Sequence, residues 1–371
     1  MRVTRVLAAT MWVGVLLTAA SFANAATTYT FAQFDVPGST QTTPFGINDT
    51  GQIVGFFNDS TGTHGFLFAP RRDDGEHDKG AGRGSFTTID VPGAFTTEAR
   101  GINNAGRIVG FFLDRLLGPE HGFLFTPRRD DREHDKRSGG SFTQIDVPGV
   151  PGDTAALDIN NVGQIVGGFG DSTGGHGFVD TAGSFTAFDV PGAQSTDASG
   201  INDAGLIVGT FRVLPPPPGG GARPHGYFRD TNGTFTTIDA PGAIDEFTGG
   251  INNAGQIVGQ FDADVSLQHP HGFVRYTNGT FIQLDVPGAM GTSASGINDT
   301  GLIVGAFTDS AGEHGFLATP VFRGTPGKAN CYGKSISGLA RQHGGLNSAA
   351  AALGFPSVRA LQNAILTFCG E

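Results

Sequence analysis

Short apolar runs separated by polar turns return six times between residues 29 and 320. A complete copy contains four such runs, and the turns between them are rich in glycine, asparagine and aspartate. In the fourth copy the runs cover residues 199–202, 206–211, a segment that begins at His225, and 235–239. Runs of this length predict β-strands, and no copy shows the period of an amphipathic helix.

The third and fourth runs of two copies are joined by a hairpin signal. Asn-Gly stands at residues 232–233 and again at 278–279, and this pair suits the two positive φ angles of a type I′ turn. Four antiparallel strands in a repeat of about 40–50 residues are typical of a β-propeller blade. The six copies therefore predict an all-β, six-bladed propeller over residues 26–320.

The position of the last strand predicts how the ring closes. The sixth copy lacks its fourth run, whereas an unassigned run of the same kind occupies residues 29–35, ahead of the first copy. A strand from the N-terminal end that completes the last blade would remove the exposed edges of an open array. We expect this closure rather than an open solenoid.

The repeated residues also carry a family resemblance. The block Gly-Ile-Asn-[Asp/Asn]-x-Gly-x-Ile-Val-Gly, followed by His-x-Phe, resembles the HAF family of extracellular bacterial repeats, and it recurs over residues 29–320. The resemblance implies an exported repeat protein and no established biochemical activity. This chain departs from the pattern by a glycine inside His-x-Phe, by Tyr227 in place of phenylalanine, and by Asp158 where five copies have glycine.

The first 25 residues have the pattern of a secretory signal peptide. Arg2 and Arg5 precede an apolar run at residues 6–17, and small residues lead to a cleavage site between Ala25 and Ala26. The alternatives, a buried strand or a membrane anchor, are less favoured because the apolar run is too short to span a bilayer. We expect a protein exported to the periplasm or the extracellular space.

Composition narrows the function classes. A net charge of −11 argues against a protein that binds nucleic acid by neutralising phosphates. Two cysteines exclude both a disulfide-rich scaffold and a four-thiolate zinc site. Beyond the signal peptide no uninterrupted apolar segment reaches 18 residues, so no transmembrane segment is expected in the mature chain.

One histidine and one aspartate recur in every repeat, and both residue types can bind metal ions. The histidine set could form a ring of imidazoles, but symmetry-related third strands lie away from the propeller axis, so we expect each histidine to be hydrogen-bonded within its own blade. The aspartate set ends the outer strands in Asp-Val-Pro-Gly corners, where turn capping is expected. We therefore expect neither metal nor cofactor. The histidines are His64, His121, His176, His225, His271 and His314, and the aspartates are Asp35, Asp90, Asp146, Asp189, Asp239 and Asp285.

The segments between the second and third strands vary most, and loops on a rigid ring commonly carry binding specificity. They cover residues 58–63, 113–120, 212–224 and 262–270, on the face opposite the charged inserts at 70–83 and 127–137. From these loops, together with the symmetry-breaking position in the third copy, the candidate ligand-binding residues are Arg212, Arg223, Asp262, Asp264 and Asp158.

Residues 321–371 form a distinct C-terminal region. Short helices are expected at 335–343, 349–353 and 358–368, and Cys331 and Cys369 bracket them. In an exported protein these cysteines should form a disulfide; a reactive or heme-binding cysteine is the alternative, although Cys-x-x-Cys-His is absent. The region resembles a small helical module that follows other domains in exported bacterial proteins, with no known chemistry.

Three functions are compatible with these features. The favoured one is a monomeric binding scaffold that takes a protein or a glycan through the loops between the second and third strands. A structural envelope or matrix protein is the second, and an extracytoplasmic hydrolase or lyase with an axial site is the third. The loops contain no nucleophile–base pair and no phosphate loop, so an enzyme is the less favoured reading, and Asp158 is its sole sequence signal.

Overall fold

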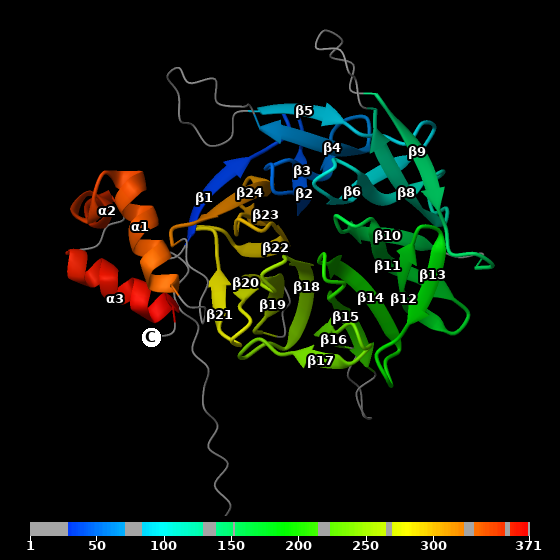
Figure 1. The fold of residues 1–371 in the computed structure, drawn as a ribbon. Coiled ribbons are helices and arrows are strands. Elements are labelled where there is room, and N and C mark those ends of the chain that lie inside the picture. The colour runs from blue at the N-terminus through cyan, green and yellow to red at the C-terminus, as the bar shows by residue number, and fades with distance from the viewer. Residues whose placement is uncertain are drawn as a thin grey trace, which may run out of the picture.

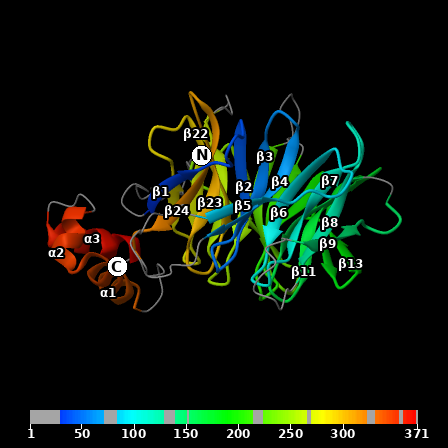
Figure 2. The ribbon, with the colours of Figure 1, turned by 90° about the horizontal axis from the view of Figure 1, so that it is seen from above.

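The computed structural model describes residues 29–70, 84–128, 139–150, 153–213, 223–264, 269–322, 330–352 and 357–369. Within these ranges the chain forms 24 strands followed by three helices. The sheets stand around a central axis (Figure 1), and the helices lie at one side of the ring (Figure 2). The fold is an all-β propeller with a small C-terminal helical module.

Each repeat contributes its strands in order from the axis outward. The innermost strands are β2 (Gln41–Ile47), β6 (Thr96–Ile102), β10 (Thr154–Ile159), β14 (Ser195–Ile201), β18 (Asp245–Ile251) and β22 (Gly291–Ile297). The second strands are β3 (Ile53–Asn58), β7 (Ile108–Leu113), β11 (Gln164–Asp171), β15 (Ile207–Val213), β19 (Ile257–Asp262) and β23 (Ile303–Asp309). The third strands are β4 (Thr63–Pro70), β8 (Glu120–Pro127), β12 (Gly174–Thr181), β16 (Arg223–Arg229), β20 (His271–Arg275) and β24 (Gly312–Pro320). The outer strands are β5 (Gly84–Thr88), β9 (Gly140–Ile145), β13 (Ser184–Phe188), β17 (Phe235–Ile238), β21 (Phe281–Leu284) and β1 (Tyr29–Phe34).

The described strands form five hydrogen-bonded sheets rather than six separate ones. Four sheets have four strands, and the fifth has eight because β12 and β14 are joined by a parallel pair between Gly175 and Ser195. The hairpin between β11 and β12 is short, and Gly175 has no side chain to hold the neighbouring strand away: a Cβ there would lie 3.1 Å from the Cβ of Ser195. β1 pairs antiparallel with β24, from Tyr29 opposite Pro320 to Phe34 opposite Gly315.

A closed cycle of asparagines links the innermost strands. Each asparagine of the Gly-Ile-Asn motif donates its side-chain N–H to the main-chain oxygen of the equivalent asparagine in the next repeat, at 3.0–3.2 Å. The last of these bonds runs from the sixth repeat back to the first. Because the asparagines are buried, breaking one of these hydrogen bonds would leave its donor and acceptor without a partner and away from water, which costs about 1–3 kcal/mol. The members are Asn48, Asn103, Asn160, Asn202, Asn252 and Asn298.

The hydrophobic core lies between neighbouring sheets. Around β11, for example, Val109 of one repeat packs with Ile159, Ile165 and Phe178 of the next. Burial of each such side chain stabilises the fold by roughly 1.5–3 kcal/mol. Gly167 of the Ile-Val-Gly motif is required here because a Cβ would overlap the carbonyl oxygen of Ala155, and glycine lets the innermost strand approach.

The helical module is tied to the propeller by one continuous core. The helices are α1 (Cys331–His343), α2 (Leu346–Ala352) and α3 (Val358–Cys369). A disulfide joins Cys331 to Cys369, as the sequence predicts. Leu339 and Leu361 are buried in the same cluster as Tyr29 of β1.

The helix boundaries differ in part from the predicted ones. α1 begins at Cys331 rather than at residue 335, because Asn330 adopts a left-handed conformation and its carbonyl accepts the N–H of Lys334. α2 begins at Leu346 rather than at residue 349. α3 begins at the predicted residue, and Ser357 caps it, since its hydroxyl accepts the N–H of Ala360 at 3.1 Å.

Several predictions concern parts of the chain outside the described residues. The signal peptide with its cleavage site lies there, as does most of both charged inserts. Among the described helices, none has the length and apolar character needed to cross a membrane.

Candidate ligand-binding site

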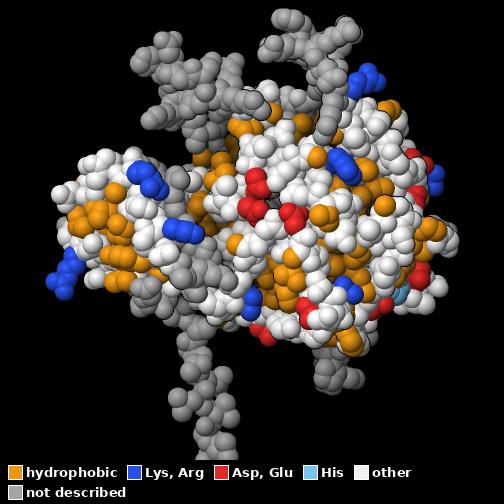
Figure 3. All heavy atoms as spheres, viewed as in Figure 1, with side chains coloured by type: hydrophobic (Ala, Val, Ile, Leu, Met, Phe, Trp, Pro, Cys, Tyr) orange, Lys and Arg blue, Asp and Glu red, His pale blue; other side chains and the backbone are white. Residues whose placement is uncertain are grey.

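The innermost strands enclose a cavity of about 320 Å³ on the propeller axis. It lies toward the end where the innermost strands begin, because its lining includes Phe247 and Thr248 of β18 as well as the isoleucines deeper along the axis. A second, smaller hollow of about 70 Å³ lies at the other end, among the asparagine cycle. Figure 3 shows a hollow at the centre of one face, with acidic side chains gathered around it. Several acids line the smaller hollow, namely Asp49, Asp203 and Asp299, whereas the larger cavity has Asp158 as the one acid in its described lining.

The cavity exists because one position of the repeat varies in size around the axis. We call this position, immediately before the Gly-Ile-Asn motif, the variable ring. Three consecutive repeats have a bulky residue there and the next three have a small one, so the free space is lopsided. The bulky members are Phe45, Arg100 and Leu157, and the small members are Ser199, Gly249 and Ser295.

The next position along each innermost strand is glycine in five repeats and Asp158 in the third. The glycines let neighbouring strands meet at the axis: a Cβ on Gly46 would lie 2.8 Å from the carbonyl oxygen of Arg100. A Cβ on Gly101 would lie 2.8 Å from Oδ1 of Asp158, so Gly101 provides the room that this carboxylate occupies. Asp158 lines both the large cavity and the smaller hollow.

Asp158 is held by two main-chain donors. The N–H of Ile201 donates to Oδ2 at 2.9 Å, and the N–H of Ile159 donates to Oδ1 at 2.8 Å. Burial raises the pKa of Asp158 to about 6, although both hydrogen bonds act in the opposite direction. The group is therefore mostly ionised at pH 7 and becomes protonated in mildly acidic solution.

Arg100 is the one cationic residue in the lining of the cavity that the structure describes. Its guanidinium lies 3.8 Å from the ring centroid of Phe45, and Nη2 donates to Oε2 of Glu98 at 2.6 Å. Burial lowers the pKa of Arg100, while Glu98 and Glu120 oppose that change. Among the described residues, no partner accepts the buried Nε–H of Arg100.

The small half of the variable ring offers polar groups to a ligand. Ser199 donates its hydroxyl to the main-chain oxygen of Thr248 at 2.7 Å, which leaves its lone pairs as acceptors. Within the described part of the chain, the side chains of Ser295 and Gln260 have no hydrogen-bond partner, and both line the cavity. The ring of Phe247 provides an apolar wall beside them.

The other predicted ligand residues lie outside this cavity. The guanidinium of Arg212 lies 5.9 Å from the ring centroid of Phe247 and its Nη1 is 4.0 Å from Asp197. Arg223 instead donates to Asp245 at 3.3 Å.

Asp262 belongs to the same neighbourhood as Arg223, since it stands opposite Asp245 in the β18–β19 ladder. Burial and the charges of Asp245 and Asp264 raise the pKa of Asp262. Of the predicted ligand residues, Asp158 is the one that lines the axial cavity.

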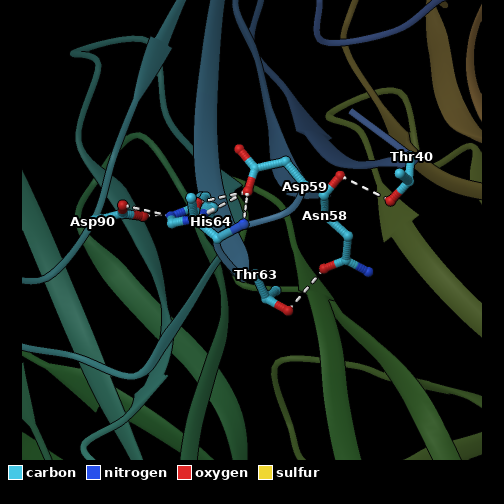
Figure 4. Close-up of polar contacts among 8 residues, drawn as sticks. Thr40, Asn58, Asp59, Thr63, His64 and Asp90 are labelled. Atoms are coloured by element: carbon cyan, nitrogen blue, oxygen red, sulfur yellow. Dashed lines mark hydrogen bonds and ion pairs between the residues drawn. The ribbon is translucent and has the colours of Figure 1, made fainter. Parts of the chain in front are cut away.

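The repeated histidines and aspartates form pairs within single sheets. Five of the histidines have Nδ1 within 2.8–3.1 Å of a carboxylate oxygen of the aspartate that ends the outer strand. Figure 4 shows the pair of His64 and Asp90. For the sixth, His225, the structure describes a ring contact with Phe211, at 5.5 Å between centroids. Among the described residues no three histidine, cysteine or acidic side chains group so as to hold a metal ion.

The surroundings of His64 resemble a hydroxyl–imidazole–carboxylate triad but have a different proton arrangement. Nε2 of His64 lies 2.8 Å from the hydroxyl of Thr61, and Nδ1 lies 2.8 Å from Asp90. The Thr61 hydroxyl donates its proton to Asp59 at 2.6 Å. The Thr61 hydroxyl therefore has no proton to give to His64, and the arrangement favours a structural role rather than an activated nucleophile.

The same arrangement in the third repeat gives a testable pH dependence. Burial lowers the pKa of His176, but its contacts with Asp189 and Asp171 outweigh this effect and leave the pKa above its usual value. The resulting stabilisation is complete below the unfolded-state pKa and is lost as the pH rises through the folded-state pKa. His176→Asn is expected to lower the free energy of unfolding by roughly 1–2 kcal/mol at pH 6 and by less at pH 9.

Chemical denaturation at both pH values measures this effect. Thr173→Ala is the matched control, because the sixth repeat has Ala311 at this position and still pairs His314 with Asp35. A cost of His176→Asn that is equal at pH 6 and pH 9 would contradict the imidazolium.

Comparisons with known proteins find distant structural similarity alone. No family model and no curated protein sequence matches the chain, so the HAF resemblance stays a prediction. Among solved structures, a Trypanosoma rangeli sialidase in complex with 2,3-difluorosialic acid is similar at a TM-score of 0.46 and 7% identity, over 81% of this chain and 59% of the sialidase. The β-propeller domain of the Trilobed protease from Pyrococcus furiosus is similar at 0.43 and 8%, over 76% and 83% of the two chains. This chain thus corresponds to less than two thirds of the sialidase.

Sequence reasoning found Asp158 and missed most of the cavity around it. The predicted set lacks Arg100, Ser295 and Gln260, because variation in loop length is conspicuous in the sequence and variation at a single strand position is not. A signal was available: the variable ring has five different residue types in six copies of an otherwise regular motif. A strand position that varies within an otherwise regular motif indicates a side chain that does not pack against the neighbouring repeat.

Proposed function

We propose that this protein is an exported binding scaffold that holds a small ligand in its axial cavity. The observation that carries the proposal is the lopsided variable ring, which opens space beside Ser199, Gly249 and Ser295 and leaves the opposite half filled. A ring of identical side chains would close the axis or leave a symmetrical channel. Asymmetry that places one carboxylate, one guanidinium and an aromatic ring around the same space is what a selective pocket requires.

The cavity and the variable loops share one face in this proposal. Gln41 at the start of β2 stands opposite Asn58, where the loop to the third strand begins, whereas Ile47 and Ile53 mark the other end. The cavity lining includes residues from the first half of β18. A protein or glycan partner that contacts the loops could therefore also place one of its groups in the cavity.

The finer architecture belongs to the same proposal. We count the eight-stranded sheet as two blades joined by one parallel pair, which gives six blades, and we infer that β1 closes the ring as the outer strand of the last blade. The six-membered asparagine cycle and the pairing of β1 with β24 support both inferences. Export rests on the signal-peptide pattern, with the disulfide in accord, and membership of the HAF repeats rests on the sequence motif.

Binding is favoured over turnover by what lines the cavity. Asp158 is the one carboxylate in the described lining, and no histidine or cysteine accompanies it there. A lone carboxylate that accepts two main-chain hydrogen bonds lacks the second group that acid–base or nucleophilic catalysis uses. The axial hydrolase or lyase is therefore the weaker alternative, and a purely structural protein would have no use for the cavity.

Recovery of a bound small molecule tests the proposal without assuming its class. The full-length protein is incubated with a low-molecular-weight cell extract, washed, denatured and analysed by mass spectrometry. We expect at least one molecule to be released from the wild type and reduced at least about ten-fold in Ser295→Phe, which fills the small half of the ring. Ser60→Phe, at an exposed loop position, is the matched control and should retain it. Equal recovery from Ser295→Phe, or none from the wild type, would refute the axial site.

A further inference from the structure

The free hydrogen-bonding groups of the cavity form a mixed set of donors and acceptors. Among the residues that the structure describes, the amide of Gln260 and the hydroxyl of Ser295 have no protein partner, and Ser199 presents unused lone pairs. The carboxylate oxygens of Asp158 each accept one main-chain N–H and keep further acceptor capacity. Such a set matches a ligand with several groups that both donate and accept, which hydroxyls do and ammonium or carboxylate groups do not.

The charges of the residues that line the cavity restrict the class of ligand further. Arg100 is neutralised by Glu98, with 2.6 Å between Nη2 and Oε2, whereas Asp158 has no ion-pair partner within the described residues. An anionic ligand would meet the carboxylate of Asp158 in a poorly solvated site, where repulsion between like charges is strong. The cavity therefore disfavours carboxylates and phosphates.

Size and shape point the same way. A volume of about 320 Å³ lies at the lower end of the range for small-molecule sites, which suits a single ring inside the cavity. The phenyl ring of Phe247 offers a flat apolar surface to the C–H face of such a ring, and the guanidinium of Arg100 lies over the ring of Phe45 in the bulky half.

From these observations we propose that the axial cavity binds a single neutral polyhydroxylated ring, such as one pyranose unit or a cyclitol. The proposal rests on the axial binding function above and names its ligand class. Asp158 accepts hydrogen bonds from two hydroxyls of the ring, Gln260 and Ser295 exchange hydrogen bonds with the others, and Phe247 covers an apolar face. The ring lies beside the main chain of Gly249 and Gly250, which line the cavity; Gly249 lets β22 approach closely, because a Cβ there would overlap the carbonyl oxygen of Ser295.

Calorimetric titration of the full-length protein with three classes of probe tests the ligand class. The probes are methyl glycosides of common hexoses with myo-inositol, then glycine betaine and ethanolamine, then acetate and lactate. We expect binding within the first class alone. Asp158→Asn should weaken it at least about ten-fold, and Ser295→Ala and Gln260→Ala about three- to ten-fold each. Asp114→Asn, an exposed acid in a loop of the same face, should leave binding unchanged.

The outcomes separate this inference from the function on which it rests. Binding of the amines or of the acids in place of the polyols would overturn the ligand class and keep the axial site. Polyol binding that Asp158→Asn and Ser295→Ala leave unchanged would place the polyol elsewhere and overturn the inference. If no probe binds while a Ser295→Phe-sensitive molecule is recovered from extract, the class is wrong and the binding function stands. If nothing is recovered either, both fail.

Discussion

Replacing Glu246 by threonine together with Ala240 by valine is expected to raise the free energy of unfolding by about 3 kcal/mol at pH 7. Glu246 is the one departure from threonine at a buried position near the start of the innermost strands. In the other repeats the threonine hydroxyl accepts the N–H of the valine in Asp-Val-Pro-Gly, at 3.0–3.3 Å. These threonines are Thr42, Thr97, Thr154, Thr196 and Thr292.

In the fifth repeat the carboxylate of Glu246 replaces that hydroxyl as the hydrogen-bond acceptor, and its burial lowers the stability of the fold. Oε2 of Glu246 accepts the N–H of Ala240 at 2.6 Å, while Oε1 is buried and has no partner among the described residues. Alanine in place of valine at residue 240 makes room for the longer side chain. Burial raises the pKa of Glu246 to about 8, and the charge of Asp239 adds to this effect.

The sign of the effect follows from proton binding. Between the unfolded-state pKa of Glu246 and its folded-state value, the native protein binds a proton that the unfolded chain has released. Wild-type stability therefore falls as the pH rises from about 4.5 to 8, and the gain of the double variant should grow from near zero at pH 4 to about 5 kcal/mol at pH 9.

Urea unfolding of the double variant and both single variants at pH 4, 7 and 9 measures the gain. Glu246→Thr alone leaves unfilled space beside Ala240, and Ala240→Val alone crowds Glu246, so the double variant should exceed the sum of the two. A gain that does not change with pH would show that packing rather than the buried acid is responsible.

The strands of this protein could be predicted from the sequence because each repeat has the same pattern of buried residues and turns. Ile-Val-Gly is buried at all three positions of every second strand, and His-Gly-Phe places a half-buried histidine before a buried glycine and a buried ring. The displaced run at residues 29–35 was enough to predict the pairing of β1 with β24. The link between β12 and β14 was not predictable in this way, since it depends on how closely a glycine hairpin approaches the next repeat.

The candidate site was harder to read because its residues are defined by differences between repeats. Asp158 was evident against five glycines, yet its cavity depends on the sizes of six residues that meet only after the ring has formed. The six regularly spaced histidines are candidate metal ligands by residue type, but the structure places five of them in separate pairs with aspartates. The regular residues of this protein pack and cap, whereas the polar side chains in the lining of the axial cavity come from positions that differ between repeats.

The second large effect is expected at Asp158. The folded-state pKa of about 6 lies above the unfolded-state value, so the native state again binds a proton that the unfolded chain has lost. Wild-type stability should fall by up to about 3 kcal/mol from this group between pH 4 and pH 7. Asp158→Gly, which restores the residue of the other five repeats, removes that loss and also removes the two hydrogen bonds from Ile159 and Ile201.

The difference between Asp158→Gly and the wild type, measured at each pH, isolates this group because Glu246 contributes equally to both proteins. We expect the variant to be no more stable than the wild type at pH 4 and to gain on it steadily up to pH 7. A constant difference would mean that Asp158 titrates normally and is open to water. If the difference instead grows with pH while polyol binding is lost, the same carboxylate weakens the fold and holds the ligand. Ligand binding would then explain why Asp158 stands at a position where five repeats have glycine, although it lowers the stability of the fold. Ligand at saturating concentration should restore part of the stability that the carboxylate removes.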